Sequence, residues 1–278
     1  MSGKLYIVGT PLGNLGDFSP RAVETLKTAD FIAAEDTRVS VKLLNHFGIK
    51  KSLVSYYEHN RAESGEKIIA RLRSGECCAL ISDAGMPAIS DPGEDLVKLC
   101  TENNIPVISV PGPCAVTAAL SASGLPSRRF CFEGFLSTAR KRRAEHLNEL
   151  KNEKRTMVFY EAPHKLQNTL RDMLGAWGDR EAAVCREMTK LHEEIMHTTL
   201  SGALSHFSET APRGEFVLII RGASDDGKPE ITLSEAEDIL NAYKARGMSL
   251  KEAAILAAAD TGFSKNDLYR SAVKKTGR

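Results

Sequence analysis

The chain has 278 residues, and its 37 Lys and Arg against 36 Asp and Glu leave a formal net charge of +1. This length allows two or three domains with ample cores. Near-neutrality excludes binding of a polyanion through overall charge, so any nucleic-acid contact must come from local patches. No apolar run approaches the roughly 18–20 residues of a membrane span, and residues 1–4 enter a strand without a signal peptide. We therefore expect a cytoplasmic protein with no membrane attachment.

The chain begins with the apolar strand Leu5–Val8, followed by a loop over residues 9–17. The loop glycines are spaced G-x-x-x-G-x-x-G, which is neither the G-x-G-x-x-G dinucleotide pattern nor a phosphate-binding P-loop. A helix is expected over 21–29, a strand over 31–34 ending in the charged run 35–38, and a further strand over 51–57.

The stretch 78–93 carries the clearest signal. The apolar run 78–81 feeds a loop, 82–93, that contains two Gly, two Pro and two Asp. Such a run followed by breakers is typical of a buried parallel strand that ends in a shaped loop. A plain strand-to-helix connection is the alternative, but this loop is long for one.

A third strand, 105–110, is followed by Pro111-Gly112-Pro113 and by a small-residue helix over 116–123. Parallel packing gathers all three Gly/Pro loops on one edge of a sheet, where α/β proteins bind ligands. The pattern thus predicts a preformed small-molecule pocket lined mostly by backbone groups.

Further along, strands are expected over 156–160, 182–185 and 216–220, and a linker over 222–229. Ser234, Ser249 and Ser264 each precede a helical pattern with an acidic residue three positions later, which predicts three capped helices over 230–278 with a helix-turn-helix-like corner. We therefore expect α/β domains over 1–120 and 121–222 and a three-helix domain over 230–278.

Metal and disulfide chemistry are not expected. The six cysteines include no C-x-x-C pair and lie in apolar surroundings, which favours reduced core thiols. His192 and His197 are five residues apart, whereas ligands on one helical face need a spacing of three or four.

Basic residues cluster at two places that could contact RNA phosphates. One is the run Arg140, Lys141, Arg142 and Arg143, which we expect to form a loop; the other is the last helix, with Arg270, Lys274 and Lys275. In both places a solvated surface is the alternative interpretation.

The ordered set of motifs resembles the tetrapyrrole-methylase superfamily of S-adenosylmethionine-dependent methyltransferases, within it the ribosomal RNA small subunit methyltransferase I branch. The motifs are the first loop, Ala34-Glu35-Asp36-Thr37-Arg38, the 81–93 loop, Pro111-Gly112-Pro113 with 123–126, and the run 159–164. The resemblance covers about the whole chain. It implies a two-domain α/β fold with a cofactor cleft between the domains, a small C-terminal helical domain, and a homodimer.

The resemblance also implies where S-adenosylmethionine binds. Its contacts map to Thr10, Pro11, Leu12, Asp83, Ala84, Gly85, Pro87, Gly112, Pro113, Cys114, Ala115, Glu161, Ala162, Met188, Pro212 and Gly214. Among these, Asp83 offers a carboxylate suited to the amino group or the ribose hydroxyls of the cofactor.

Acceptor activation has five candidates, Glu35, Asp36, Arg38, Glu187 and Lys190. A carboxylate could take the proton of a ribose 2′-OH while Lys190 stabilises negative charge on its oxygen. Alternatively, Glu35, Asp36 and Arg38 form an ion-pair network that only braces the loops.

Three functions are compatible with the sequence. The first, implied by the resemblance, is 2′-O-methylation of a cytidine in 16S ribosomal RNA, within an assembled 30S particle. The second is methylation of a small precorrin-like tetrapyrrole, which would not need the basic clusters. The third is an RNA-binding module with a vestigial pocket, against which three intact Gly/Pro loops argue.

Overall fold

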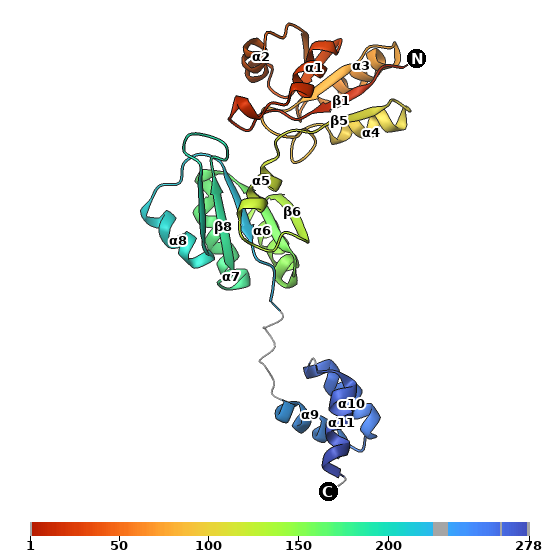
Figure 1. Ribbon diagram of the computed structural model, residues 1–278, viewed down its shortest axis with the longest axis vertical. Coiled ribbons are helices and arrows are strands. Elements are labelled where there is room, and N and C mark those ends of the chain that lie inside the picture. The colour runs from red at the N-terminus through yellow and green to blue at the C-terminus, as the bar shows by residue number, and fades with distance from the viewer. Residues whose placement is uncertain (1, 225–232, 262, 277–278) are drawn as a thin grey trace. The chain divides into compact units, whose positions relative to one another are not determined.

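A computed structural model of the protein describes residues 2–224, 233–261 and 263–276, without the side chains of residues 259 and 273–276 (Figure 1). By compactness the chain divides into two units, Met1–Gly222 and Ala223–Arg278. Each is described by itself below. The expected linker over 222–229 falls mostly on residues 225–232, outside the described residues.

The first half of unit Met1–Gly222 is a five-stranded parallel sheet in the order β3-β2-β4-β1-β5. The strands are β1 Leu5–Val8, β2 Phe31–Ala34, β3 Ser52–Ser55, β4 Cys78–Ile81 and β5 Val107–Val110, close to the expected ranges. The connecting helices are η1 Leu15–Asp17, α1 Pro20–Thr28, α2 Thr37–His46, α3 Arg61–Arg73 and α4 Glu94–Glu102.

Helices cover both faces of this sheet, because each strand is apolar on both sides. Leu26 of α1 and Leu44 of α2 pack with Ile32 on one face. On the other face Leu72 of α3 and Leu96 of α4 pack with the remaining strand side chains. In this doubly wound sheet the chain order of the strands reverses between β1 and β4, because β1 leads to α1 on one face and β4 leads to α4 on the other. The loops after these two strands therefore leave toward opposite faces and open a crevice between them.

The second half of this unit is a mixed sheet in the order β6-β7-β10-β8-β9, parallel only between β6 and β7. Its strands are β6 Phe130–Phe135, β7 Thr156–Glu161, β8 Glu181–Arg186, β9 Glu194–Thr199 and β10 Phe216–Ile220. The helices are α5 Ala115–Ala122, α6 Arg140–Glu149, η2 Leu150–Asn152, α7 Pro163–Trp177 and α8 Leu200–Glu209.

The sequence reasoning missed β6 and β9 and was wrong about residues 140–143, which begin α6 instead of forming a loop. β6 carries a bulge between Phe132 and Gly134 that interrupts its alternation, and β9 is the half-exposed strand at the sheet edge. Neither therefore shows a strong apolar period.

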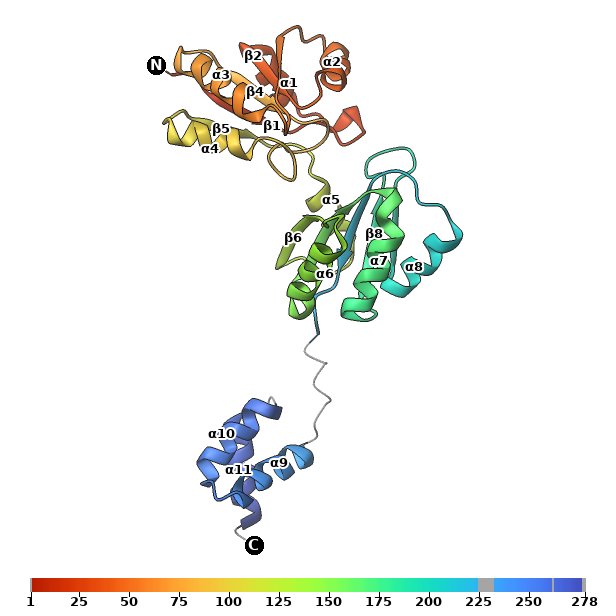
Figure 2. The same cartoon turned by 180° about the vertical axis from the view of Figure 1, so that it is seen from behind.

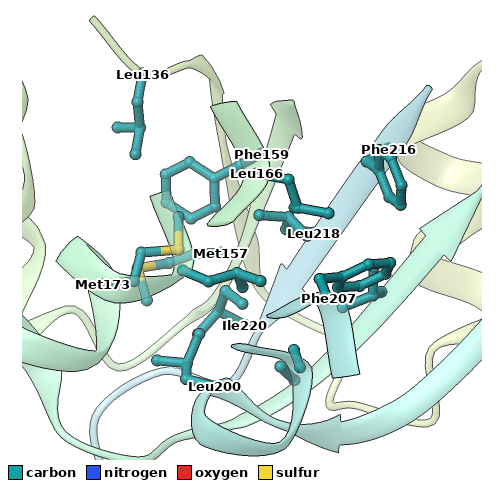
Figure 3. Close-up of a cluster of buried hydrophobic side chains, with 14 of the residues drawn as sticks. Leu136, Met157, Phe159, Leu166, Met173, Leu200, Phe207, Phe216, Leu218 and Ile220 are labelled. Carbon is teal, nitrogen blue, oxygen red and sulfur yellow. The ribbon is translucent and has the colours of Figure 1, made fainter. Parts of the chain in front are cut away.

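One face of the second sheet is covered by α6, α7 and α8 (Figure 2). Phe159 and Leu218 from the strands meet Leu166 and Met173 of α7 and Phe207 of α8 in a closed apolar cluster (Figure 3). The opposite face holds α5, whose Val116, Ala119 and Leu120 contact the alternate strand residues. α5 begins before residue 120, the expected end of the first domain, yet it packs on the second sheet.

Unit Ala223–Arg278 contains α9 Leu233–Ala245, α10 Leu250–Thr261 and α11 Lys265–Thr276 around a core with Leu240 and Leu268. At α10 the expected capping box is formed: the Ser249 hydroxyl accepts from the Glu252 amide, and the Glu252 carboxylate accepts from the Ser249 amide at 3.0 Å. Ser264 caps α11 by accepting from the Asp267 amide. The box expected at Ser234 was wrong, because this residue lies inside α9.

Candidate active site

The three Gly/Pro loops of the first sheet converge at its carboxyl edge. Thr10 and Gly85 exchange two backbone hydrogen bonds of 2.8 and 3.1 Å, which tie the first loop to the loop after β4. Gly9 and Gly112 touch: a Cβ on either would lie 2.7 Å from the other's Cα, so only two glycines permit this approach. The loops after β1, β4 and β5 are thereby locked to one another at the β1/β4 crevice.

A cavity of about 290 Å³ opens beside these loops. Its walls come from the loop edge of the first sheet and from β7, β10, the start of α5 and the start of α7 in the second half of the same unit. The lining residues are Leu12, Ala84, Gly85, Met86, Ile89, Asp91, Cys114, Ala115, Phe135, Tyr160, Glu161, Ala162, Pro163, Glu215, Phe216 and Val217.

Seven of the expected cofactor contacts line this cavity: Leu12, Ala84, Gly85, Cys114, Ala115, Glu161 and Ala162. Glu161 is buried, and its carboxylate accepts from the Ala162 amide at 2.8 Å and from the Thr169 hydroxyl, which fixes the junction between β7 and α7. The backbone of its partly buried neighbours in the lining is therefore held in place.

The other expected cofactor contacts do not line the cavity. Thr10 is fully buried, and its hydroxyl donates to the Ser82 carbonyl at 3.2 Å, so its side chain holds loops together. Asp83 lies at a separate hollow with Glu35 and Asp36. Met188 packs among the side chains around α5. Pro11, Pro87, Gly112, Pro113, Pro212 and Gly214 are likewise absent from the lining.

Asp91 is the most informative lining residue that the sequence reasoning missed. It lies in the 82–93 loop that had been singled out, but no motif distinguished its carboxylate from that of Asp83. Burial raises the pKa of Asp91 from 3.8 to about 6. A hydrogen bond with Ser82 lowers the pKa, but its effect is smaller than that of burial. Phe135, Glu215, Phe216 and Val217 were missed because they enter from strands that carry no motif.

The segment that presents Asp91 is strained. Ala88 and Ser90 both have φ of +65°, in the left-handed region that side chains with a Cβ rarely adopt. Such conformations persist only where the surrounding structure enforces them, and they concentrate at binding and catalytic sites. The strained loop is therefore a candidate part of the functional site.

Lys190, Glu187 and Glu215 form an ion cluster next to the cavity. The Lys190 ammonium donates to the Glu187 carboxylate at 3.0 Å and to the Glu215 carboxylate at 2.9 Å, and Glu215 lines the cavity. The Lys190 stem packs on Gly13, where a Cβ would lie 2.4 Å from Lys190 Cγ. The turn after β8 is thus held against the first loop.

Opposing effects set the pKa values in this cluster. Burial alone would raise the pKa of Glu187, but hydrogen bonds from Lys190 and from the Glu215 amide lower it overall. Burial alone would lower the pKa of Lys190, but its hydrogen bonds to both carboxylates raise it overall. Glu187 and Lys190 are therefore charged at neutral pH, and Lys190 is a fixed cation beside the cavity.

In the charged run after β2, two of the side chains bond to each other. Asp36 is the N-cap of α2 and accepts from the Arg38 amide at 2.8 Å and from the Arg38 guanidinium at 3.0 and 2.6 Å. These bonds lower the pKa of Asp36 to about 2. Glu35 differs: burial, followed by the nearby Asp91 and Asp83, raises its pKa.

The basic residues expected to contact RNA divide into two groups. Arg140, Lys141 and Arg142 are exposed in the first turn of α6, which has no acidic residue and no side-chain cap. Arg143 is instead mostly buried, and its Nε donates to Asp172 of α7 at 2.7 Å. Arg270 is exposed on α11, whereas the side chains of Lys274 and Lys275 lie outside the described residues.

Within the described ranges, no three His, Cys, Asp or Glu side chains gather as metal ligands. The helices in that same part of the chain are all too short or too polar to cross a membrane. His197, considered with His192 as a ligand pair, lies on β9.

The chain is similar to known proteins along its whole length. Residues 4–204 match the model of the tetrapyrrole (corrin/porphyrin) methylases, and residues 232–275 match that of the RsmI C-terminal HTH domain. The chain is 47% identical over 269 residues to the ribosomal RNA small subunit methyltransferase I of a Synechocystis species, covering 96% of each protein.

The protein of the same name from Halalkalibacterium halodurans is 48% identical over 271 residues, which cover 96% of this chain and 93% of that protein. The crystal structure of a cobalt precorrin-4 methyltransferase superposes with a TM-score of 0.59 at 20% identity, over 78% of this chain and 94% of the other. The chain belongs to the tetrapyrrole methylase family, in its ribosomal RNA small subunit methyltransferase I group.

Proposed function

We propose that this protein transfers a methyl group from S-adenosylmethionine to the 2′-hydroxyl of a cytidine in small-subunit ribosomal RNA. The methyltransferase activity and the RNA substrate accord with the names of its relatives, which are 44–49% identical to it. The position on the ribose and the identity of the base are the finer parts of the proposal, implied by the family resemblance.

The charge of the cavity lining carries the proposal. Three carboxylates, Asp91, Glu161 and Glu215, line the cavity, and among the described residues no Lys, Arg or His does, although Lys190 lies beside it and donates to Glu215. Phe135 and Tyr160 add aromatic faces, which attract cations. A cavity of this size with carboxylates and aromatic rings in its lining suits a cationic sulfonium donor.

The chain's own groups would hold the donor through backbone. Ala84 and Gly85 present one wall and Cys114 and Ala115 another, on loops that the Thr10–Gly85 hydrogen bonds and the Gly9–Gly112 contact tie to the first loop. Ala162 supplies the facing wall from the second sheet. When bound there, S-adenosylmethionine supplies the electrophilic methyl group. Loops that are rigid before binding lose little conformational freedom in holding it.

Asp91, which lines the cavity, is the proton acceptor that we propose for the acceptor hydroxyl. A general base works best with a pKa near the operating pH, and among the cavity carboxylates Asp91 has its pKa raised to about 6. Of the candidates from the sequence, Lys190 keeps a role as the cation that offsets negative charge near the acceptor oxygen, with Glu187 orienting it. Asp36 and Arg38 bond to each other, which favours the alternative interpretation for these two residues but not for Glu35, which is in none of the ion pairs among the described residues.

RNA would be held by the exposed cations at the start of α6. Arg140, Lys141 and Arg142 lie at the positive end of a helix dipole, an arrangement that costs stability unless an anion neutralises it. Phosphates of an assembled 30S particle in the cytoplasm would do so, and Arg270 is an exposed cation of the second unit that would bind a phosphate by itself. We also expect a homodimer, which mass measurement in solution would reveal.

Labelled S-adenosylmethionine tests the proposal directly. The protein is incubated with small-subunit particles, naked ribosomal RNA or a porphyrinoid precursor, and labelled RNA is digested with alkali. Label in small-subunit RNA at a bond that resists alkaline cleavage supports 2′-O-methylation. Label in the tetrapyrrole alone, or in RNA whose bonds all remain cleavable, contradicts it.

A further inference from the structure

A second hollow lies at the carboxyl ends of β2, β3 and β4, separate from the cavity of the methyl donor. It measures about 470 Å³ and is lined by side chains from all three strand ends, among them Glu35, Arg38, Tyr57 and Asp83. Asp83 and Ala84 are consecutive, and Ala84 lines the donor cavity, so the two spaces lie on either side of one loop.

The aromatic side chain at this hollow is held out of the core by its backbone. Tyr56 is buried with 1% of its surface exposed, and its amide donates to the Ala34 carbonyl at 2.8 Å, in line with the β2–β3 ladder. The next residue, Tyr57, therefore points outward and is 41% exposed. Asn60 fixes this turn: its carboxamide accepts from the Tyr57 amide at 2.8 Å and donates to the Ser55 carbonyl at 3.0 Å.

Beside this ring are two carboxylates that have few partners of their own. Asp83 accepts one hydrogen bond, from the Asp36 amide at 3.1 Å, through one of its two oxygens. Glu35 is partly buried and forms none of the ion pairs found among the described residues. At the rim, Arg38 is paired with Asp36 but keeps 88% of its side chain exposed.

Each of these groups matches one part of a nucleotide. Unpaired bases stack on exposed aromatic rings, as single-stranded RNA does in sequence-specific complexes. Carboxylates accept from the exocyclic amino group of cytosine or adenine, whereas the carbonyl that uracil has at that edge would be repelled. An exposed guanidinium pairs with phosphate.

We infer that the hollow of Tyr57, Glu35 and Asp83 is a base-binding subsite, which takes an unpaired, amino-bearing RNA base and so selects cytidine over uridine beside the donor cavity. The inference rests on the proposed function and adds to it the site that recognises the base. Glu35 is thereby placed as a specificity residue, and the proton acceptor remains in the neighbouring cavity.

The test compares Tyr57→Ala and Tyr57→Phe in methyl transfer from labelled S-adenosylmethionine to small-subunit particles at varied particle concentration. Val41→Ala, which shortens an equally exposed side chain on α2, is the matched control. We expect Tyr57→Ala to lower kcat/KM for the particles about tenfold or more, and Tyr57→Phe and Val41→Ala to stay within about twofold. The calorimetric affinity for S-adenosylmethionine should not change in any variant, because Tyr57 does not line the donor cavity.

A second arm uses particles that carry uridine in place of the target cytidine. The wild type should lose about tenfold or more in kcat/KM on them, and Glu35→Gln should narrow this preference because an amide can also donate to a carbonyl. Equal rates on both particles, an unaffected Tyr57→Ala, or a Tyr57→Phe as impaired as Tyr57→Ala each overturn the base-binding subsite while leaving the proposed function intact. A wild type that labels no RNA overturns both.

Discussion

Replacing Asp91 with Asn should stabilise the protein at neutral pH while impairing catalysis. The carboxylate is partly buried at the cavity, where burial raises its pKa from 3.8 to about 6. At about 1.4 kcal/mol for each pKa step this corresponds to about 3 kcal/mol, which solvent screening of a partly exposed group reduces to about 1–2 kcal/mol. The neutral amide avoids that cost.

The sign follows from the direction of the shift. A carboxyl group whose pKa is raised on folding favours the folded state while it is protonated, and this contribution is lost as the pH rises through about 6. Asp91→Asn should therefore raise the melting temperature by about 3–6 °C at pH 8 and leave it unchanged near pH 4. Differential scanning calorimetry across this range measures both.

Activity should change in the opposite sense. If Asp91 accepts the hydroxyl proton, kcat/KM of the wild type should rise with pH through about 6, and Asp91→Asn should lose about 100-fold or more without that rise. Single-turnover transfer to small-subunit particles at several pH values provides the profile. A variant that is no more stable at pH 8, or one that keeps the wild-type pH profile, would refute the reasoning.

Three further changes test the loops, the ion cluster and the basic segment. Gly9→Ala should weaken S-adenosylmethionine binding in calorimetry and lower stability by about 1–3 kcal/mol, because its Cβ would meet Gly112 backbone at 2.7 Å; an unchanged affinity would contradict the locking of the loops. Lys190→Met should reduce kcat about tenfold or more with little effect on cofactor affinity, and an unchanged kcat would assign Lys190 to structure alone. Glutamine at residues 140–142 should reduce the slope of log binding constant against log salt concentration for particle binding by about 2–3. Arg143→Gln should chiefly lower the melting temperature, because it breaks the bond to α7. An unchanged slope in the triple variant would make the segment a solvated surface.

The sequence predicted the first sheet well because its strands are short apolar runs, and three of them are followed by loops with Gly and Pro. Leu5–Val8 and Phe31–Ala34 match the structure residue for residue, and the gathering of the loops on one edge follows from parallel packing. The half-exposed strands of the second sheet were missed, since a bulge or an edge position removes the alternation on which such predictions depend.

The cavity was predicted only in part, for a physical reason. Residues such as Leu12 and Gly85 sit on loops whose composition marks them, and they line it. Whether Thr10 or Asp83 faces the cavity depends on the direction of a single side chain, which a one-residue difference in a loop reverses. Phe135 and Glu215 reach the cavity through the pairing of distant strands, and nothing local in the sequence records that pairing.

A crystal structure with S-adenosylhomocysteine bound would test the central claim most directly. We predict that the ligand lies in the cavity between the loops, against Gly85 and Ala115 on one side and Ala162 on the other, with its sulfur facing the Asp91 carboxylate. Ligand density at another surface, with this cavity filled only by solvent at saturating concentration, would contradict it.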